Sequence, residues 1–226
     1  MGLAILTRED VAAYARALAP LEVIALPVTR TEPPPDPDAL ARALAEPHDA
    51  VLVASARAAR CVLGTTAEVW AVGPATAALF PAARTPDVAD AASLAHALLA
   101  ARGPIRVLVP RAEEGREEAV AILRTAGAHV IEAIAYRTAV VPAGDPTLAA
   151  GLAALPRADV IVVFAPSQVA ALAMIVSLRA LTGTFVAIGP TTAAALRDHG
   201  IEPAVAAAPT PEGIANAVAA VYPTRR

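Results

Sequence analysis

Residues suited to binding an anion recur in this chain directly after short apolar runs. They are Ser55, Arg57, Gly73 and Thr76 in the first half and Arg111, Arg116, Ser167, Gly189, Thr191 and Thr192 in the second. If each run is a strand followed by a helix, the helix N-terminus presents unpaired backbone N–H groups, and a nearby arginine offers a bidentate fork. Neither a carboxylate pair nor a nucleophile with a base accompanies them. The pattern therefore favours binding of carboxylate or phosphate groups.

Each of these residues also has a purely structural interpretation. The serines and threonines can cap the helices that follow them, which uses the same geometry as anion binding. Gly73 and Gly189 can be required only because the backbone turns there. Their Gly-Pro context does not match the dinucleotide-binding pattern. The arginines, with Arg8 among them, can be solvated surface charges.

Composition excludes several classes of function. The 226 residues carry a net charge of −3 and give no basic stripe for nucleic acid, and aromatics at 3% give no stacking platform. All 18 basic residues are arginine, so lysine-dependent Schiff-base and Walker chemistry is excluded. Cys61, the single cysteine, can form neither an intrachain disulfide nor a cysteine-based zinc site, which suits a reducing cytoplasm. The four histidines show no metal-ligand spacing.

Alternating strand and helix patterns predict an α/β protein with parallel sheets. The expected strands are 3–7, 22–26, 50–54, 69–72, 105–109, 129–134, 160–164, 185–188 and 204–207, with an uncertain tenth at 84–88. Helices are expected to follow most of them, for example at 115–126 and 191–199, and Cys61 falls within another. The uncharged stretch 160–178 is interpreted as strand, loop and helix, because Pro166, Ser167 and Gln168 interrupt it.

The second half of the chain repeats the first, with the seam near Gly103. Residues 3–31 match 106–138, the segment from Asp36 matches that from Asp145, and the segment from Val69 matches that from Phe185. Ordered matches that include both Gly-Pro turns predict a duplication and two doubly wound α/β domains, of simple or exchanged connectivity. The proline-rich turns 33–37 and 142–146 are the expected linkers.

Several motifs in this order resemble the uroporphyrinogen-III synthase family over almost the whole chain. They are the Asp-led strand ending in Ser-x-Arg (49–57), Ala-Val-Gly-Pro-Ala-Thr-Ala (71–77), the Gly-Arg helix leading to Gly-Ala and a tyrosine (115–136), Ala-Ile-Gly-Pro-Thr-Thr-Ala (187–193) and Pro-Thr-Pro-Glu-Gly (209–213). The resemblance implies two flavodoxin-like doubly wound parallel-sheet domains joined by a two-stranded linker. The first would hold residues 1–30 and 142–226, and the second residues 31–141 with the linker strands.

The resemblance also implies a reaction. The family, a group of cyclising hydro-lyases of heme biosynthesis, closes hydroxymethylbilane into uroporphyrinogen III and water, inverting the terminal pyrrole ring without metal or organic cofactor. Every ring of this linear tetrapyrrole carries acetate and propionate groups, which arginines and helix N-termini can neutralise. The expected protein is a cytoplasmic monomer that binds no nucleic acid or membrane and receives its substrate by transient hand-over from hydroxymethylbilane synthase.

Site roles follow from the same resemblance. Tyr136 matches the family's cleft tyrosine and is expected to donate a hydrogen bond to the departing hydroxyl. Thr76 and Thr192 match its paired threonines, which face the substrate from opposite domains, and the other residues of the strand-end loops are expected to contact the substrate. Ala54 and Ala165 stand where many members carry a hydroxyl, which puts some side-chain contacts in doubt.

Two other functions stay open. A binding or sensor module for a tetrapyrrole or small anion fits the thin set of catalytic side chains. A nucleotide-dependent oxidoreductase rests on analogy of fold alone.

Overall fold

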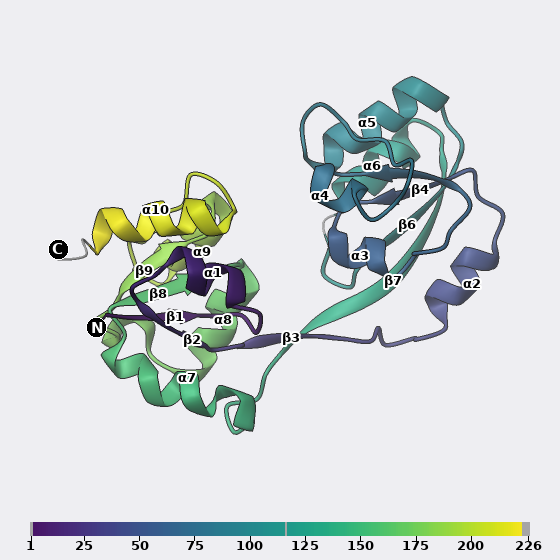
Figure 1. Cartoon of the computed structure of the whole chain (residues 1–226). Helices are drawn as coiled ribbons and strands as arrows, with labels where there is room; N and C mark the ends of the chain where they lie inside the picture. The colour runs from purple at the N-terminus through teal and green to yellow at the C-terminus, as the bar shows by residue number, and fades with distance from the viewer. Residues whose placement is uncertain (1, 116, 223–226) are drawn as a thin grey trace. The chain divides into compact units, whose positions relative to one another are not determined.

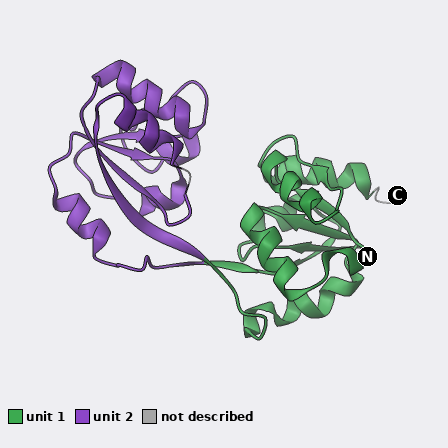
Figure 2. Cartoon of the chain, turned by 180° about the vertical axis from the view of Figure 1, so that it is seen from behind, with its two compact units in different colours: residues 1–30, 139–226 green, residues 31–138 purple. Residues whose placement is uncertain are grey.

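The computed structural model describes residues 2–115 and 117–222 of the chain. Two compact units divide it: unit 1 holds residues 1–30 and 139–226, and unit 2 holds residues 31–138 (Figure 2). The division passes through two strands, a few residues before each proline-rich turn that the sequence analysis expects as a linker.

Unit 1 is a parallel five-stranded sheet with the order β10-β9-β8-β1-β2 (Figure 1). Its elements are β1 (Leu3–Leu6), α1 (Ala12–Ala17), β2 (Glu22–Ala25), η1 (Pro146–Leu148), α7 (Ala149–Ala154), η2 (Leu155–Arg157), β8 (Val160–Val163), α8 (Pro166–Ile175), η3 (Leu178–Ala180), β9 (Thr184–Ala187), α9 (Pro190–Asp198), β10 (Ala204–Val205) and α10 (Pro211–Val221).

Both faces of this sheet are buried. Ile5 and Ile161 lie in the apolar cluster with α7, α8 and α9, whereas Leu6 and Val162 lie in the cluster with α1 and α10. Successive strand residues point to opposite faces, so a strand buried on both faces has to be apolar throughout. The uninterrupted runs in the sequence follow from this burial.

Unit 2 has the strand order β3-β7-β6-β4-β5. The pairs β7–β6, β6–β4 and β4–β5 are parallel. Its elements are β3 (Thr29–Glu32), α2 (Ala39–Ala45), β4 (Ala50–Val53), α3 (Ala56–Arg60), β5 (Glu68–Ala71), α4 (Pro74–Ala77), α5 (Ala91–Arg102), β6 (Arg106–Ala112), α6 (Glu118–Thr125) and β7 (His129–Val140), of which β3 and β7 extend across the division. Leu52 and Trp70 pack in the cluster with α5 and α6, and Val51 and Val53 in the one with α2 and α3.

The strand pairs within each unit show which elements of the two units correspond. Ala4 of β1 pairs with Val160 of β8 in unit 1, and Val107 of β6 pairs with Ala50 of β4 in unit 2. Thus β1 corresponds to β6 and β8 to β4, which are the pairs that the sequence repeat matches. Each unit combines strands from both halves of the chain, so the connectivity is exchanged rather than simple.

The fold is α/β with parallel sheets, as the sequence predicts, but several local expectations are wrong. The segment 84–88 contributes only an isolated bridge between Arg84 and Trp70. Strand β7 runs to Val140 instead of ending at Ile134, because β3, which the sequence analysis does not predict, lies beside it in the sheet. Cys61 is the residue after α3 rather than part of it, and α6 begins at Glu118 rather than at Gly115.

The uncharged stretch 160–178 contains β8 and α8, separated by a two-residue loop. Among the described residues, no helix has the length and apolar character needed to cross a membrane.

Candidate functional site

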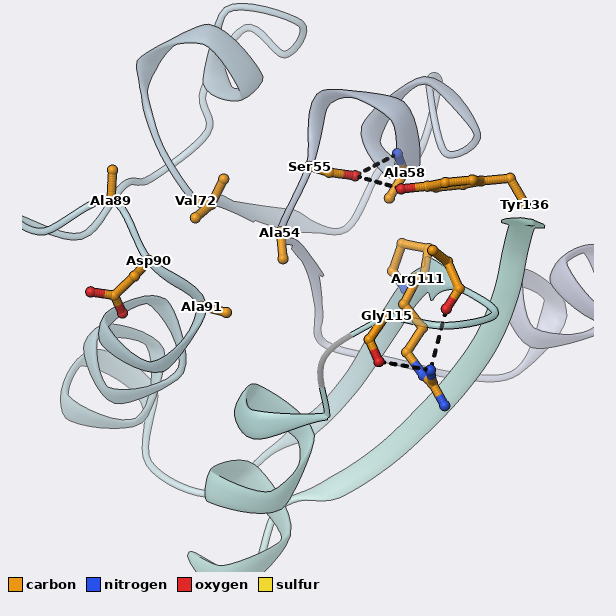
Figure 3. Close-up of a pocket in the computed structure, with 12 residues that line it drawn as sticks. Ala54, Ser55, Ala58, Val72, Ala89, Asp90, Ala91, Arg111, Gly115 and Tyr136 are labelled. Carbon is orange, nitrogen blue, oxygen red and sulfur yellow. Dashed lines mark hydrogen bonds between the residues drawn. The ribbon is translucent and has the colours of Figure 1, made fainter. Parts of the chain in front are cut away.

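A pocket of about 390 Å³ lies within unit 2, where β4, β5 and β6 end (Figure 3). Its lining residues are Ala54, Ser55, Ala58, Val72, Ala89, Asp90, Ala91, Pro110, Arg111, Ala112, Gly115 and Tyr136. Ligands of parallel α/β sheets bind beyond the carboxyl ends of the strands, and this pocket occupies that position. Of the predicted site residues, the pocket brings together Ser55, Arg111 and Tyr136.

Tyr136 reaches the pocket from β7, and only 9% of its surface is exposed. Its hydroxyl lies 3.3 Å from Ser55 Oγ, and either oxygen can donate this hydrogen bond (Figure 3). The guanidinium carbon of Arg57 stands 5.2 Å from the centroid of the Tyr136 ring, which is cation–π distance. These contacts fix the ring while the phenol O–H remains able to donate to a ligand.

Ser55 has two roles at once. It is the N-cap of α3, where its extended backbone lets Oγ accept the Ala58 N–H at 3.0 Å. The same oxygen contacts the Tyr136 hydroxyl. The capping interpretation of Ser55 is therefore correct without excluding contact with a ligand.

Arg111 follows the apolar part of β6, and its guanidinium is already hydrogen-bonded to groups of unit 2. Its Nε donates to Glu132 Oε2 at 2.7 Å, and one terminal nitrogen donates to Glu117 Oε1 at 3.1 Å. The other terminal nitrogen donates to the carbonyls of Ala112, Glu113 and Gly115 at 3.2–3.4 Å. These bonds hold Ala112, Glu113, Gly115 and Glu117 in place, so the structure gives Arg111 an architectural role. Arg116, predicted beside it, lies outside the described residues.

The two Gly-Pro turns have the same geometry. Gly73 and Gly189 are the N-caps of α4 and α9, with φ of −175° and −176°, an extended backbone that any residue adopts. A Cβ built on Gly189 meets no atom within 4 Å, and one built on Gly73 lies 3.3 Å from the Ala89 Cβ. The interpretation that these glycines serve only for turning is therefore wrong. Their lack of a side chain leaves the backbone approachable, most clearly at Gly189.

The threonines after these glycines differ in burial. Thr76 and Thr192 are each the third residue of their helix and are 5% and 1% exposed, whereas Thr191 is exposed. Thr76 lies in unit 2, and Thr191 and Thr192 lie in unit 1.

Ser167 does not occupy the position that corresponds to Ser55. Counting from the paired residues Ala50 and Val160, Ser55 corresponds to Ala165, which is the N-cap of α8 and provides no side-chain cap. Ser167 is the second residue of that helix and is exposed. The two serines therefore follow corresponding strands, but they occupy different positions and have different geometries.

Asp90, which is not among the predicted site residues, lines the pocket as the N-cap of α5. Its carboxylate accepts the Ser93 N–H at 2.7 Å and the Ser93 hydroxyl at 3.0 Å. The backbone hydrogen bond from Ser93, followed by the one from its hydroxyl, lowers the pKa of Asp90 below 3.8. The pocket thus carries a carboxylate that is ionised at neutral pH. The Asp-x-x-Ser spacing was the available signal, since it is typical of an N-cap.

Comparison with known protein families identifies the family to which this chain belongs. The model of the uroporphyrinogen-III synthase HemD family matches residues 9–216. This chain belongs to the uroporphyrinogen-III synthase family. The resemblance drawn from the strand-end motifs is confirmed, and the match supports catalytic function in heme biosynthesis over the binding-module alternative.

Solved structures of uroporphyrinogen-III synthases share the fold. The enzyme of Helicobacter pylori is 18% identical, with a TM-score of 0.70 and coverage of 97% of this chain and 99% of that chain. A mutant enzyme of Thermus thermophilus is 22% identical, with a TM-score of 0.58 and coverage of 91% and 92%. No curated protein sequence gives a significant match.

Proposed function

We propose that this protein is a cyclising hydro-lyase that converts hydroxymethylbilane into uroporphyrinogen III and water. The observation that carries the proposal is the family match over residues 9–216. The pocket of unit 2 adds chemical support, because it combines a buried tyrosine hydroxyl with an ionised carboxylate.

In the proposed reaction, the terminal hydroxyl leaves as water and an azafulvene forms. The substituted carbon of the last pyrrole ring then attacks to give a spiro intermediate, which fragments and recloses at the other carbon. The inverted ring of the product results from that second closure.

The role proposed for Tyr136 is to donate a hydrogen bond to the departing hydroxyl. A phenol that is 9% exposed and contacts Ser55 Oγ has a fixed orientation, which is what a positioned donor needs. Asp90 is ionised in the same pocket and is suited to accept a pyrrole N–H.

The substrate contacts proposed for the strand-end loops rest on exposed donors. Thr191 and Ser167 are exposed in the first turns of α9 and α8, and Gly189 leaves open space in front of the backbone. Arg57 is exposed and can combine its contact with the Tyr136 ring with binding of a substrate carboxylate. Thr76 and Thr192 are buried in the first turns of α4 and α9. The substrate contact proposed for each of them is made by its side-chain hydroxyl.

We further infer that the two units are flavodoxin-like domains. The order β2-β1-β8-β9-β10 of unit 1 corresponds to the flavodoxin-type order 2-1-3-4-5, and β7-β6-β4-β5 repeats its first four positions in unit 2. The β3 and β7 segments form the proposed two-stranded linker. A cytoplasmic monomer that receives the substrate from hydroxymethylbilane synthase completes the proposal.

A coupled assay tests the function. Hydroxymethylbilane is generated with and without the folded protein, the products are oxidised, and the type I and type III uroporphyrin isomers are separated. The proposal expects type III to appear only with the protein, because unassisted closure gives type I. Type I alone, from a sample whose circular dichroism shows the α/β fold, contradicts it.

A further inference from the structure

The strand alignment places two arginines at equivalent positions in the two units. Arg8 lies four residues after Ala4 in unit 1, and Arg111 lies four residues after Val107 in unit 2. Arg8 lies two residues after the end of β1, and Arg111 is the second-last residue of β6, so both are at the carboxyl end of an interior strand of their sheet. Any difference between them therefore reflects their surroundings and not their place in the fold.

Among the described residues, Arg111 has acidic partners and Arg8 has none. Arg111 forms ion pairs with Glu117 and Glu132. Within residues 2–115 and 117–222, no aspartate or glutamate forms an ion pair with Arg8. Its neighbours Glu9 and Asp10 are exposed, and Asp10 accepts the N–H of Ala12 instead.

Aromatic side chains hold the guanidinium of Arg8. Its carbon lies 4.8 Å from the centroid of the Tyr14 ring and 5.0 Å from that of Phe164. One terminal nitrogen donates to the Tyr14 hydroxyl at 3.0 Å. The two rings meet edge to face at 5.0 Å, so they form a stable cradle. A flexible surface arginine has no such constraint.

Inside this cradle, Nε of Arg8 is buried, and no group in the described part of the chain accepts its hydrogen bond. A buried N–H without an acceptor is costly, and a half-buried cation without a counter-ion adds to that cost. An anion bound by the terminal nitrogens would supply the missing counter-charge.

The adjoining helix start favours the same kind of ligand. Phe164 leads through Ala165 into α8, whose N-cap has no side-chain cap. Ser167 is exposed in the first turn of this ten-residue helix. The positive end of the helix dipole therefore attracts negative charge, as does the guanidinium of Arg8, which has no acidic partner in the described part of the chain.

From these observations we infer that Arg8 is a carboxylate-binding residue of unit 1. This inference rests on the proposed function, whose substrate carries acetate and propionate groups on every ring, and it assigns the binding of one such group to Arg8. The side chain acts by binding the substrate and takes no part in the chemical step. Its loss therefore affects affinity and KM, and leaves kcat nearly unchanged.

Binding of uroporphyrinogen III, kept reduced under anaerobic conditions, tests the inference by titration calorimetry. Arg8→Gln is expected to raise the Kd about tenfold, as removal of one charge-assisted contact does. In the coupled assay the KM rises by a similar factor, while kcat stays within about twofold. Added salt should reduce the difference in Kd between Arg8→Gln and wild type, because it screens the attraction between Arg8 and the carboxylate in wild type.

The matched control is Arg16→Gln. Arg16 lies on α1 of the same unit, is exposed, and forms no ion pair among the described residues. Both variants remove one positive charge, so an effect of net charge alone would be the same in both. Arg16→Gln is expected to bind like wild type.

The outcomes separate this inference from the proposed function. If wild type makes type III and Arg8→Gln binds like wild type, the Arg8 inference is wrong and the proposed function stands. If Arg8→Gln binds more weakly but wild type makes no type III, the carboxylate site stands and the function is wrong. If wild type does not bind uroporphyrinogen III, the inference is overturned. Should Arg8→Gln not fold, Arg8→Lys replaces it, for which weaker binding supports the inference and unchanged binding overturns it.

Discussion

The two units share a strand order but differ at the carboxyl ends of their strands. Unit 2 carries Tyr136, and the corresponding residue of unit 1 is Thr29. Unit 2 caps its helix α3 with Ser55, whereas unit 1 has Ala165 before α8. Arg111 is neutralised inside unit 2, and Arg8 lacks an acidic partner among the described residues. Duplicated scaffolds can thus diverge mainly in their loops, which here leaves one unit suited to hydrogen-bond chemistry and the other to binding negative charge.

The largest expected difference concerns the tyrosine. Tyr136→Phe removes the phenol O–H and keeps the ring against Arg57, so kcat for type III formation should fall about a hundredfold with little change in KM. Thr29→Val, the matched change in unit 1, should leave both constants near wild type. Steady-state kinetics in the coupled assay measure both variants. Wild-type turnover by Tyr136→Phe would remove the role proposed for this residue.

The two arginines should differ in stability. Arg111→Gln removes the donor to the carbonyls of Ala112, Glu113 and Gly115 and weakens the pairing of Glu132, which should lower the free energy of unfolding of unit 2 by about 2 kcal/mol. Trp70, the single tryptophan, is buried in unit 2, so its fluorescence during urea unfolding reports that unit.

Arg8→Gln, in the other unit, should leave the Trp70 transition in place. If both arginine variants shifted the urea transition of Trp70 equally, the prediction that only Arg111 stabilises unit 2 would be wrong.

The N-caps permit an exchange between the units. Ser55→Ala should destabilise unit 2 by about 1 kcal/mol, because the Ala58 N–H loses its acceptor. Ala165 has an extended backbone like that of Ser55, so Ala165→Ser should stabilise unit 1 by up to about 1 kcal/mol. Urea unfolding followed by Trp70 measures the first change, and thermal unfolding followed by circular dichroism measures the second. Destabilisation by Ala165→Ser would mean that the two loops are not equivalent.

The smallest expected effect is a difference in pH dependence. Asp90 caps α5 in unit 2, and Thr210, which does not titrate, caps α10 in unit 1. Because hydrogen bonds from Ser93 lower the pKa of Asp90 below 3.8, the cap contributes stability above that pH and loses it as the pH falls through the lowered value.

The urea midpoint reported by Trp70 should therefore drop less between pH 5.5 and pH 3 in Asp90→Asn than in wild type. Thr210→Asn is the control and should show the wild-type change. The same pH dependence in all three proteins would contradict the role of Asp90.

The local sequence pattern predicts many of the strands and helices of this fold, but few of the contacts within the site. Strands such as β4 and β8 are apolar throughout because both of their faces are buried, so their positions could be predicted. Strand β3 (Thr29–Glu32) is polar and depends on pairing with β7, about a hundred residues later, so no local signal marked it.

The site depends on distant contacts of the same kind. The hydrogen bond between Ser55 and Tyr136 joins residues 81 positions apart and requires β7 to continue past Ile134. The contrast between Arg8 and Arg111 depends partly on Glu132, which the pairing of β7 with β6 brings next to Arg111. Residue types at strand ends could be predicted, but their partners could not.

The isomer composition of the product at increasing protein concentration is the most direct measurement of the central claim, that this chain directs ring closure. Spontaneous closure to type I competes with the protein for hydroxymethylbilane. If the chain directs ring closure, the fraction of type III rises with protein concentration and saturates near complete conversion. A product that stays type I at every concentration of folded protein would contradict it.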